Sequence, residues 1–137
     1  MVKKLGIITL LLLSCLGCGK AGDYVPNVSV NFVMPIDPKL SVLHHNFGAI
    51  YIKGYGVAGL ILYRRADGTY AAYDACSAYL PQNKCILAID NPSYTVTDPC
   101  SGSKWSLEDG TPVKAPAIKS LKEYQAYTDG YNIFVQN

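Results

Sequence analysis

The side chains of this sequence that could carry chemistry are three thiols, one carboxylate and a pair of histidines. They are Cys76, Cys85, Cys100, Asp98, His44 and His45. Cysteine, aspartate and histidine are the ligand types that zinc prefers. A zinc site made of Cys76, Asp98 and one of the two histidines is therefore one hypothesis, although the spacing matches no zinc motif. Adjacent residues of an extended segment point to opposite faces, so the favoured interpretation of His44 and His45 is two solvent-facing loop residues.

Nucleophilic catalysis is not indicated. Ser101 and Ser103 stand close to Asp98, but no histidine follows His45, and a serine nucleophile needs an adjacent general base. No nucleophile elbow or carboxylate pair stands out in the sequence. We therefore expect the protein not to be an enzyme. Short polar side chains in turns commonly bond to backbone amides, and this is the role predicted for Asp98 and Ser101.

Two stretches around these residues resemble the cluster-holding loops of Rieske iron–sulfur proteins. They are Asp74-Ala75-Cys76-Ser77-Ala78 and Asp98-Pro99-Cys100-Ser101-Gly102-Ser103-Lys104-Trp105-Ser106-Leu107-Glu108-Asp109-Gly110. The family carries Cys-x-His in its first loop and Cys-Pro-x-His-Gly-Ser-x-Phe, followed by an acidic-Gly turn, in its second. The frame of the second loop is kept as Pro99, Gly102, Ser103, the aromatic Trp105 and the turn that ends at Gly110.

The ligand positions of that pattern are mostly changed. A Rieske [2Fe-2S] cluster needs two thiolates on one iron and two imidazoles on the other. Cys76 matches the first cysteine, but Ala78 replaces the first histidine, Asp98 the second cysteine and Ser101 the second histidine. The resemblance therefore implies the fold and the place of the site, while these four positions predict no bound cofactor. The alternative is a retained [2Fe-2S] cluster.

The resemblance also implies a disulfide, because many family members pair an extra cysteine from each loop. Cys100 stands at the structural cysteine of the second loop, and Cys85 follows Cys76 in the first loop, later than is usual. We expect a Cys85–Cys100 bond that contributes about 3 kcal/mol in the chain-entropy model, with Cys76–Cys100 as the alternative. Cys76 is then a free thiol, and a buried thiol is favoured over a reactive one.

Length and composition indicate one all-β domain. The chain has 137 residues, with eleven tyrosines, twelve glycines and eight prolines, a composition that favours strands and turns over helices. Without Lys3 and Lys4, ten basic residues face ten acidic ones. A balanced domain of this kind has no basic surface for phosphate backbones, so nucleic acid is not an expected partner.

The first residues resemble a bacterial lipoprotein signal. Lys3 and Lys4 precede an apolar run, residues 7–13, that is too short for a permanent span. Leu16-Gly17-Cys18 is the favoured lipobox and Leu12-Leu13-Ser14-Cys15 the alternative, with a plain secretory signal as a third possibility. The expected organisation is a signal peptide at residues 1–17, a lipidated tether at 18–27 that starts at Cys18, and a β domain at 28–137.

Short apolar or alternating segments separated by turn signals predict a sandwich or small barrel. The predicted strands are residues 28–32, 49–53, 60–65, 70–74, 86–89, 93–97, 104–106, 123–128 and 131–136, with a loop or short helical turn around residues 40–43. The almost continuous apolar run at residues 60–63 is typical of a strand covered on both faces. The resemblance specifies three stacked antiparallel β-sheets with the two site loops at one tip.

These inferences together predict a non-enzymatic binding or structural module, held by a lipid anchor to the outer or inner membrane of a bacterial cell envelope. The membrane is one expected partner, and an unknown protein or glycan is another. The many tyrosines suit half-exposed strand positions, although some of them could form a binding surface. The alternative function is electron transfer by a Rieske-type [2Fe-2S] centre, or service as an accessory subunit of an oxidoreductase.

Overall fold

The computed structural model describes residues 24–137, and the expected signal peptide, with Cys15 and Cys18, lies outside the described residues. The strands are β1 (Asn31–Pro35), β2 (Ala49–Ile52), β3 (Leu60–Arg64), β4 (Tyr70–Asp74), β5 (Ala88–Ile89), β6 (Thr95–Thr97), β7 (Lys104–Ser106), β8 (Pro112–Lys114), β9 (Glu123–Thr128) and β10 (Asn132–Gln136). Two short 3-10 helices, η2 (Ser41–His44) and η3 (Pro81–Asn83), complete the described part. Within residues 24–137, no helix is long and apolar enough to cross a membrane.

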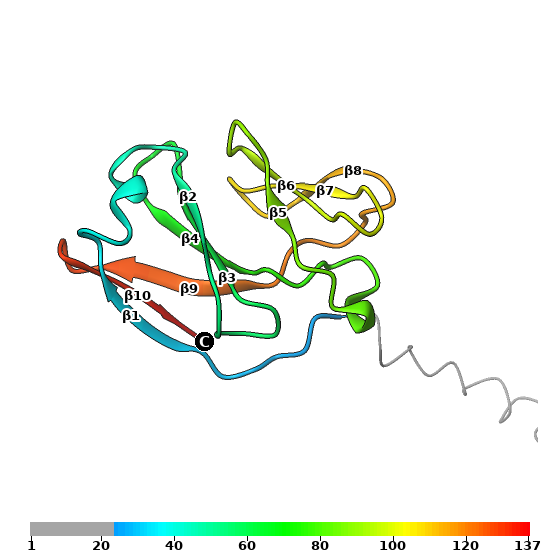
Figure 1. The fold of residues 1–137 in the computed structure, drawn as a ribbon, viewed down its shortest axis with the longest axis horizontal. Helices are drawn as coiled ribbons and strands as arrows, with labels where there is room; N and C mark the ends of the chain where they lie inside the picture. The colour runs from blue at the N-terminus through cyan, green and yellow to red at the C-terminus, as the bar shows by residue number, and fades with distance from the viewer. Residues whose placement is uncertain (1–23) are drawn as a thin grey trace, which may run out of the picture.

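The strands form antiparallel sheets in three layers (Figure 1). A six-stranded sheet has the order β1-β10-β9-β4-β3-β2, and a four-stranded sheet has the order β5-β6-β7-β8. The all-β prediction is confirmed. Two of the three expected sheets are continuous, because β4 pairs with β9 through Ala72–Tyr124 and Tyr73–Glu123 and the joined sheet folds over on itself.

The hairpin of β3 and β4 is the central layer and separates two hydrophobic cores. On β3, Leu60 and Leu62 face the core shared with β1, β9, β10 and η2, while Ile61 and Tyr63 face the core under the four-stranded sheet. All four side chains are buried. Successive side chains of a strand point to opposite faces, so the apolar run at 60–63 is covered on both faces, as the sequence predicted.

The first strand and β8 differ most from the prediction, and asparagine and proline explain these two differences. The first strand begins at Asn31 and not at Val28, because the side chain of Asn137 bonds to Val28 O at 2.6 Å and to Val30 N at 2.9 Å. β8 was not among the predicted strands, since it begins at Pro112 and ends just before Pro116 in sequence. β8 is an edge strand, the position in a sheet that tolerates proline.

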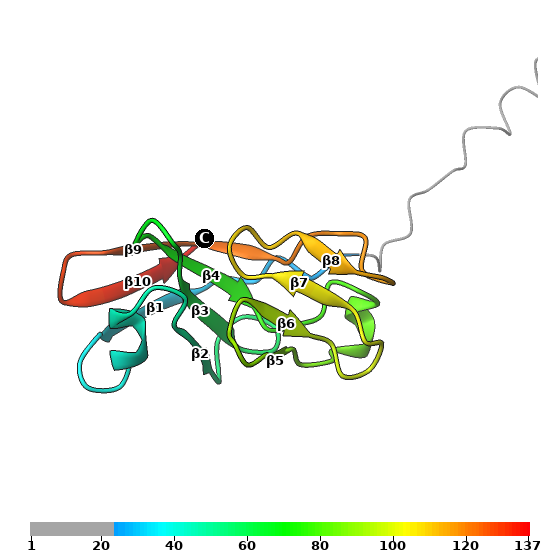
Figure 2. The same ribbon diagram turned by 90° about the horizontal axis from the view of Figure 1, so that it is seen from above.

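The segment that precedes β1 runs along the outside of the domain to the end that carries η3, as both views show (Figures 1 and 2). Val28 packs against the first core. Tyr24 lies at the other end of the segment, where the Lys119 ammonium is 3.7 Å from the centre of its ring. The later part of the expected tether is thus placed on the domain.

Candidate functional site

The two site loops meet at one tip of the molecule. The first loop leaves β4 at Asp74 and reaches β5, with η3 in its middle, and the second loop connects β6 to β7. Within the first loop, Cys76 forms an isolated bridge with Ile86, and Ser77 N–H donates to Cys85 O at 2.9 Å. The first loop therefore folds back on itself and presents its two ends beside the second loop.

Asp74 anchors the start of the first loop. Its carboxylate is fully buried and accepts four hydrogen bonds, from Val57 N at 2.6 Å, Ala58 N at 3.1 Å, Cys76 N at 2.9 Å and the Tyr124 hydroxyl at 2.7 Å. Gly56 has a φ of +64°, and a Cβ atom at that position would lie 2.4 Å from Asp74 Oδ2. The glycine-rich turn after β2 thus wraps closely around this carboxylate.

Cys76 and Ala78, the two ligand positions of the first loop, have different surroundings. The Cys76 thiol is buried, with its Sγ 3.6 Å from Pro81 O. Burial, followed by the nearby carboxylate of Asp74, raises the pKa of this thiol to about 11, so it remains protonated and unreactive near neutral pH. Ala78 is half-buried and lines a cleft of about 370 Å³ with Tyr24, Val25 and residues 119–123. It offers no donor atom.

Asp98 and Ser101, the ligand positions of the second loop, bond to each other. The Asp98 carboxylate is fully buried and accepts from Cys100 N, the Ser101 hydroxyl and the Ser77 hydroxyl, each at 2.8 Å. Ser101 Oγ also accepts from Ser103 N at 3.2 Å. As predicted, both side chains bond to loop amides. Because Ser77 belongs to the first loop, Asp98 also joins the two loops.

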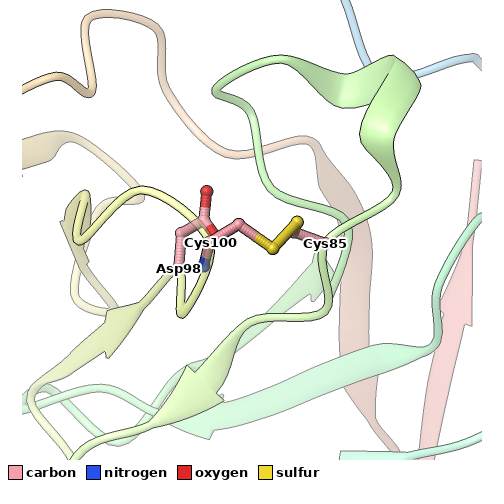
Figure 3. Close-up of side chains that lie close together, drawn as sticks. All are labelled: Cys85, Asp98 and Cys100. Carbon is pink, nitrogen blue, oxygen red and sulfur yellow. A yellow bond between two sulfur atoms is a disulfide. The ribbon is translucent and has the colours of Figure 1, made fainter.

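Cys85 and Cys100 join the same loops covalently. They are paired as a disulfide with their Cα atoms 6.3 Å apart, which is the pairing that the sequence resemblance implied. Figure 3 shows this bond running from the first loop to the second, with the Asp98 side chain directly beside Cys100. Among the described residues, Cys76 is the free cysteine.

Trp105, in the strand that follows the second loop, anchors that loop to the second core. Its side chain is fully buried in the second core, and its indole N–H donates to Lys119 O at 2.8 Å. The following turn closes against Tyr73, whose hydroxyl donates to Leu107 O at 3.1 Å. Gly110, at φ +76°, passes so close to Tyr73 that a Cβ atom would lie 2.8 Å from the ring. The retained frame residues therefore fix the backbone of the tip.

The structure contradicts the zinc hypothesis for Cys76, Asp98 and a histidine. His44 Nε2 lies 2.8 Å from Asp37 Oδ1, both side chains are exposed, and η2 is outside the site loops. Among residues 24–137, the group of three metal-ligating side chains that does come together is Cys85, Asp98 and Cys100. Neither histidine joins it.

Two residues of the site had no predicted role. Ser77 links the loops through Asp98, and Asp74 organises four donors from three parts of the chain. A signal existed for Asp74, since a carboxylate at the end of a buried strand needs several donors.

Comparison with solved structures identifies the fold. The plasma membrane Rieske protein PetC3 of the cyanobacterium Synechocystis PCC 6803 aligns with 79% of this chain and 99% of its own, at 22% identity and a TM-score of 0.56. The domain has a Rieske-like fold. The ferredoxin of carbazole 1,9a-dioxygenase from Nocardioides aromaticivorans IC177 aligns with 80% of this chain and 97% of its own, at 18% identity and a TM-score of 0.49. No protein-family model and no curated protein matches the chain.

Proposed function

We propose that this protein is a lipid-anchored, non-enzymatic binding or structural module of the cell envelope, whose Rieske-like domain has lost its iron–sulfur cluster. The observation that carries the proposal is the chemistry of the four ligand positions. Only Cys76 keeps its ligand type, and its thiol is buried and holds its proton. Asp98 and Ser101 are engaged with each other, and Ala78 has nothing to donate. This donor set does not fit a cluster that requires two imidazoles.

Two other links between the loops support the proposal. The Cys85–Cys100 disulfide and the Ser77–Asp98 hydrogen bond both cross from the first loop to the second. In a Rieske protein the cluster itself makes such a connection, because its ligands come from both loops. Ordering long turns costs conformational entropy, and the crosslink together with the buried hydrogen bonds offsets that cost without a metal.

An envelope location is supported by the expected lipobox and by the disulfide. Disulfides persist in oxidising compartments outside the cytosol. One structural neighbour is named as a plasma membrane protein, which favours a membrane location for this chain too. Acylation of Cys18, or of Cys15 in the alternative register, is the proposed anchor.

A binding role is supported by an apolar row on the outer face of the six-stranded sheet. Val33, Phe134 and Tyr127 lie opposite one another on β1, β10 and β9. The rings of Tyr127 and Phe134 stack with centroids 4.9 Å apart, and Val33 is 52% exposed. Exposed aromatic and apolar side chains in one patch are typical of interaction surfaces. A protein or a glycan is the proposed partner of this row.

Electron transfer is the second candidate, as a free carrier or as an accessory subunit of an oxidoreductase. The observation in its favour is that one structural neighbour is a Rieske protein by name. At this level of identity the likeness establishes the fold, so the choice depends on the ligand positions.

Purification of the full-length protein from native membranes separates the two candidates. We expect a colourless protein without stoichiometric iron and without a rhombic paramagnetic signal after reduction. Two irons per chain together with that signal would establish the electron carrier and refute the proposed function. Co-purification in parallel, with wild-type protein and with Tyr127→Ser, tests the binding role. A partner retained by the wild type and lost by the variant supports it, and the absence of any stable partner counts against it.

A further inference from the structure

Three potential metal ligands converge at the tip, on both sides of the junction between the loops. The sulfur atoms of Cys85 and Cys100 and a carboxylate oxygen of Asp98 all lie within 4.8 Å of one another (Figure 3). They line a small cavity of about 60 Å³, together with Ser101 and residues of the first loop around η3, namely Tyr79, Leu80 and Asn83. A space of this size accommodates an ion with a bound water.

The ligand types suit zinc. Zinc binds cysteine sulfur at about 2.3 Å and carboxylate oxygen at about 2.0–2.2 Å in tetrahedral geometry. Ligand atoms around one zinc ion are therefore separated by roughly 3.5–4 Å, so the two sulfurs, which are bonded to each other in this structure, must move apart after reduction to bind one ion. While the sulfurs are bonded to each other they carry no thiolate charge, so the oxidised tip cannot use them as ligands.

Asp98 is already oriented as a metal-binding carboxylate would be. Hydrogen bonds from Ser77, Ser101 and the Cys100 amide, each 2.8 Å long, hold both of its oxygens. Ligating carboxylates are usually fixed by such outer partners, which set their direction and raise metal affinity. One of these partners, Ser77, comes from the first loop, so the loops keep a hydrogen bond between them when the disulfide is open.

We propose that the reduced tip binds Zn²⁺ through Cys85, Cys100 and Asp98, and that the oxidised tip does not. A dithiol reductant supplies two electrons and two protons, opens the Cys85–Cys100 bond and becomes a disulfide itself. The two thiols then release their protons as they bind the ion, while the carboxylate binds as an anion. Cys100 is exposed and Cys85 half-buried, so a reductant reaches the bond from solvent. The loops are thus tied covalently in one state and by a metal in the other.

This proposal concerns different ligands from those of a Rieske cluster and does not depend on the lipid anchor or on the binding partner. Cys76, the one matching cluster position, takes no part in it. The two proposals therefore fail separately: iron in the native protein would refute the loss of the cluster, and the absence of divalent-metal binding after reduction would refute the zinc site.

Cobalt is the spectroscopic probe for the test, because tetrahedral Co²⁺ with thiolate ligands absorbs strongly in the near ultraviolet and the visible. The full-length protein in detergent is reduced with a phosphine and titrated with Co²⁺ and then with Zn²⁺. We expect one Co²⁺ per chain with sulfur-to-cobalt bands, displacement by Zn²⁺, and no bands in the oxidised protein. Cys85→Ser and Cys100→Ser should abolish the bands, and Asp98→Asn should weaken binding at least tenfold.

Cys76→Ser is the matched control, since it removes the third thiol and should leave the titration unchanged. Thermal unfolding gives an independent readout: Zn²⁺ should raise the melting temperature of the reduced protein and leave that of the oxidised protein unchanged. The proposal is overturned by a reduced wild type without thiolate bands, by bands that survive both single serine variants, or by bands lost in Cys76→Ser. A reduced protein that is unfolded and that Zn²⁺ does not refold would overturn it equally.

Discussion

The buried carboxylate of Asp74 provides a sharp test of how the first site loop is held. Three of its four donors are backbone amides, of Val57, Ala58 and Cys76, which cannot turn round, and the fourth is the Tyr124 hydroxyl. Asp74→Asn keeps the shape of the side chain but replaces one acceptor oxygen with a donor. Whichever way the amide is turned, its NH₂ group faces at least one backbone N–H.

The expected loss of stability follows from the number of hydrogen bonds that the substitution breaks. A hydrogen bond to a charged group contributes about 1.5–3 kcal/mol, and an unpaired buried donor costs about 1–3 kcal/mol. The substitution breaks at least one such bond, strands its amide and removes the charge that strengthens the others. We expect Asp74→Asn to lower the free energy of unfolding by roughly 3–5 kcal/mol, a large part of the ~5–15 kcal/mol typical of a domain.

Asp98→Asn is the matched comparison, because two of the three donors to Asp98 are hydroxyls. The hydroxyls of Ser77 and Ser101 can accept from the new NH₂ group and donate elsewhere: Ser77 Oγ lies 3.1 Å from Tyr79 O, and Ser101 Oγ lies 2.9 Å from Ser103 Oγ. The Cys100 amide keeps an oxygen to bind. We therefore expect a cost of only about 1 kcal/mol, which also keeps this variant folded for metal titration.

Equilibrium unfolding in urea, with the disulfide intact in every variant, measures both costs. Fluorescence of Trp105, the single tryptophan of the sequence, reports the unfolding transition. In a separate thermal experiment, the melting temperature of Asp74→Asn should fall by roughly 10–20 °C. The reasoning is refuted if Asp74→Asn costs no more than Asp98→Asn. It is also refuted if the free energy of unfolding of Asp74→Asn lies within about 1 kcal/mol of the wild-type value, because the three backbone amides would then not depend on the carboxylate.

Three further predictions address the anchor, the free thiol and pH. Mass spectrometry should find acyl chains on Cys18, and Cys18→Ala should release the protein from membranes; acylation at Cys15 would correct the register, and a soluble unacylated native protein would exclude the anchor. Iodoacetamide at pH 8 should label no thiol of the folded domain and only Cys76 after unfolding without reductant, whereas labelling before unfolding would contradict its burial. Burial, and next the carboxylate of Glu123, raises the pKa of Tyr73 to about 12 from 10.0, so the unfolded state ionises first and stability should fall between pH 10 and 12. A stability profile that stays flat to pH 12 would contradict this.

The strands were predictable because their pattern is local. Alternation of apolar and polar residues and continuous apolar runs are visible within a few residues of sequence. These patterns located nine of the strand regions, including β3, which is buried on both faces. β8 was missed because Pro112 and Pro116 are turn signals by composition, and only its position at a sheet edge makes the first of them acceptable. The late start of β1 was not predictable either, since it depends on Asn137 at the other end of the chain.

The site was predictable to the extent that its contacts are also local. Asp98 bonds to Cys100 and Ser101, two and three residues further along the chain, and loop chemistry suggests such contacts directly. The Ser77–Asp98 bond joins residues 21 apart in sequence, and the Tyr124–Asp74 bond joins residues 50 apart. The pairing of β4 with β9 brings Tyr124 to Asp74. Ser77 lies beside Cys85, whose disulfide partner Cys100 is two residues from Asp98. Sequence spacing does not encode such geometry.

The hydrogen bonds at the tip bear on whether cluster ligands could be introduced at Asp98 and Ser101. Asp98 accepts from both loops, so restoring a cysteine there would remove an oriented acceptor and leave the Cys100 amide and two serine hydroxyls to find other partners. Restoring a histidine at Ser101 would break one of the same bonds and place a larger ring in a half-buried position. Each ligand gained singly thus costs hydrogen bonds before a cluster can bind and compensate. On the proposed function, the hydrogen bonds of the tip therefore oppose the stepwise gain of cluster ligands, and the Rieske-like frame is kept around them.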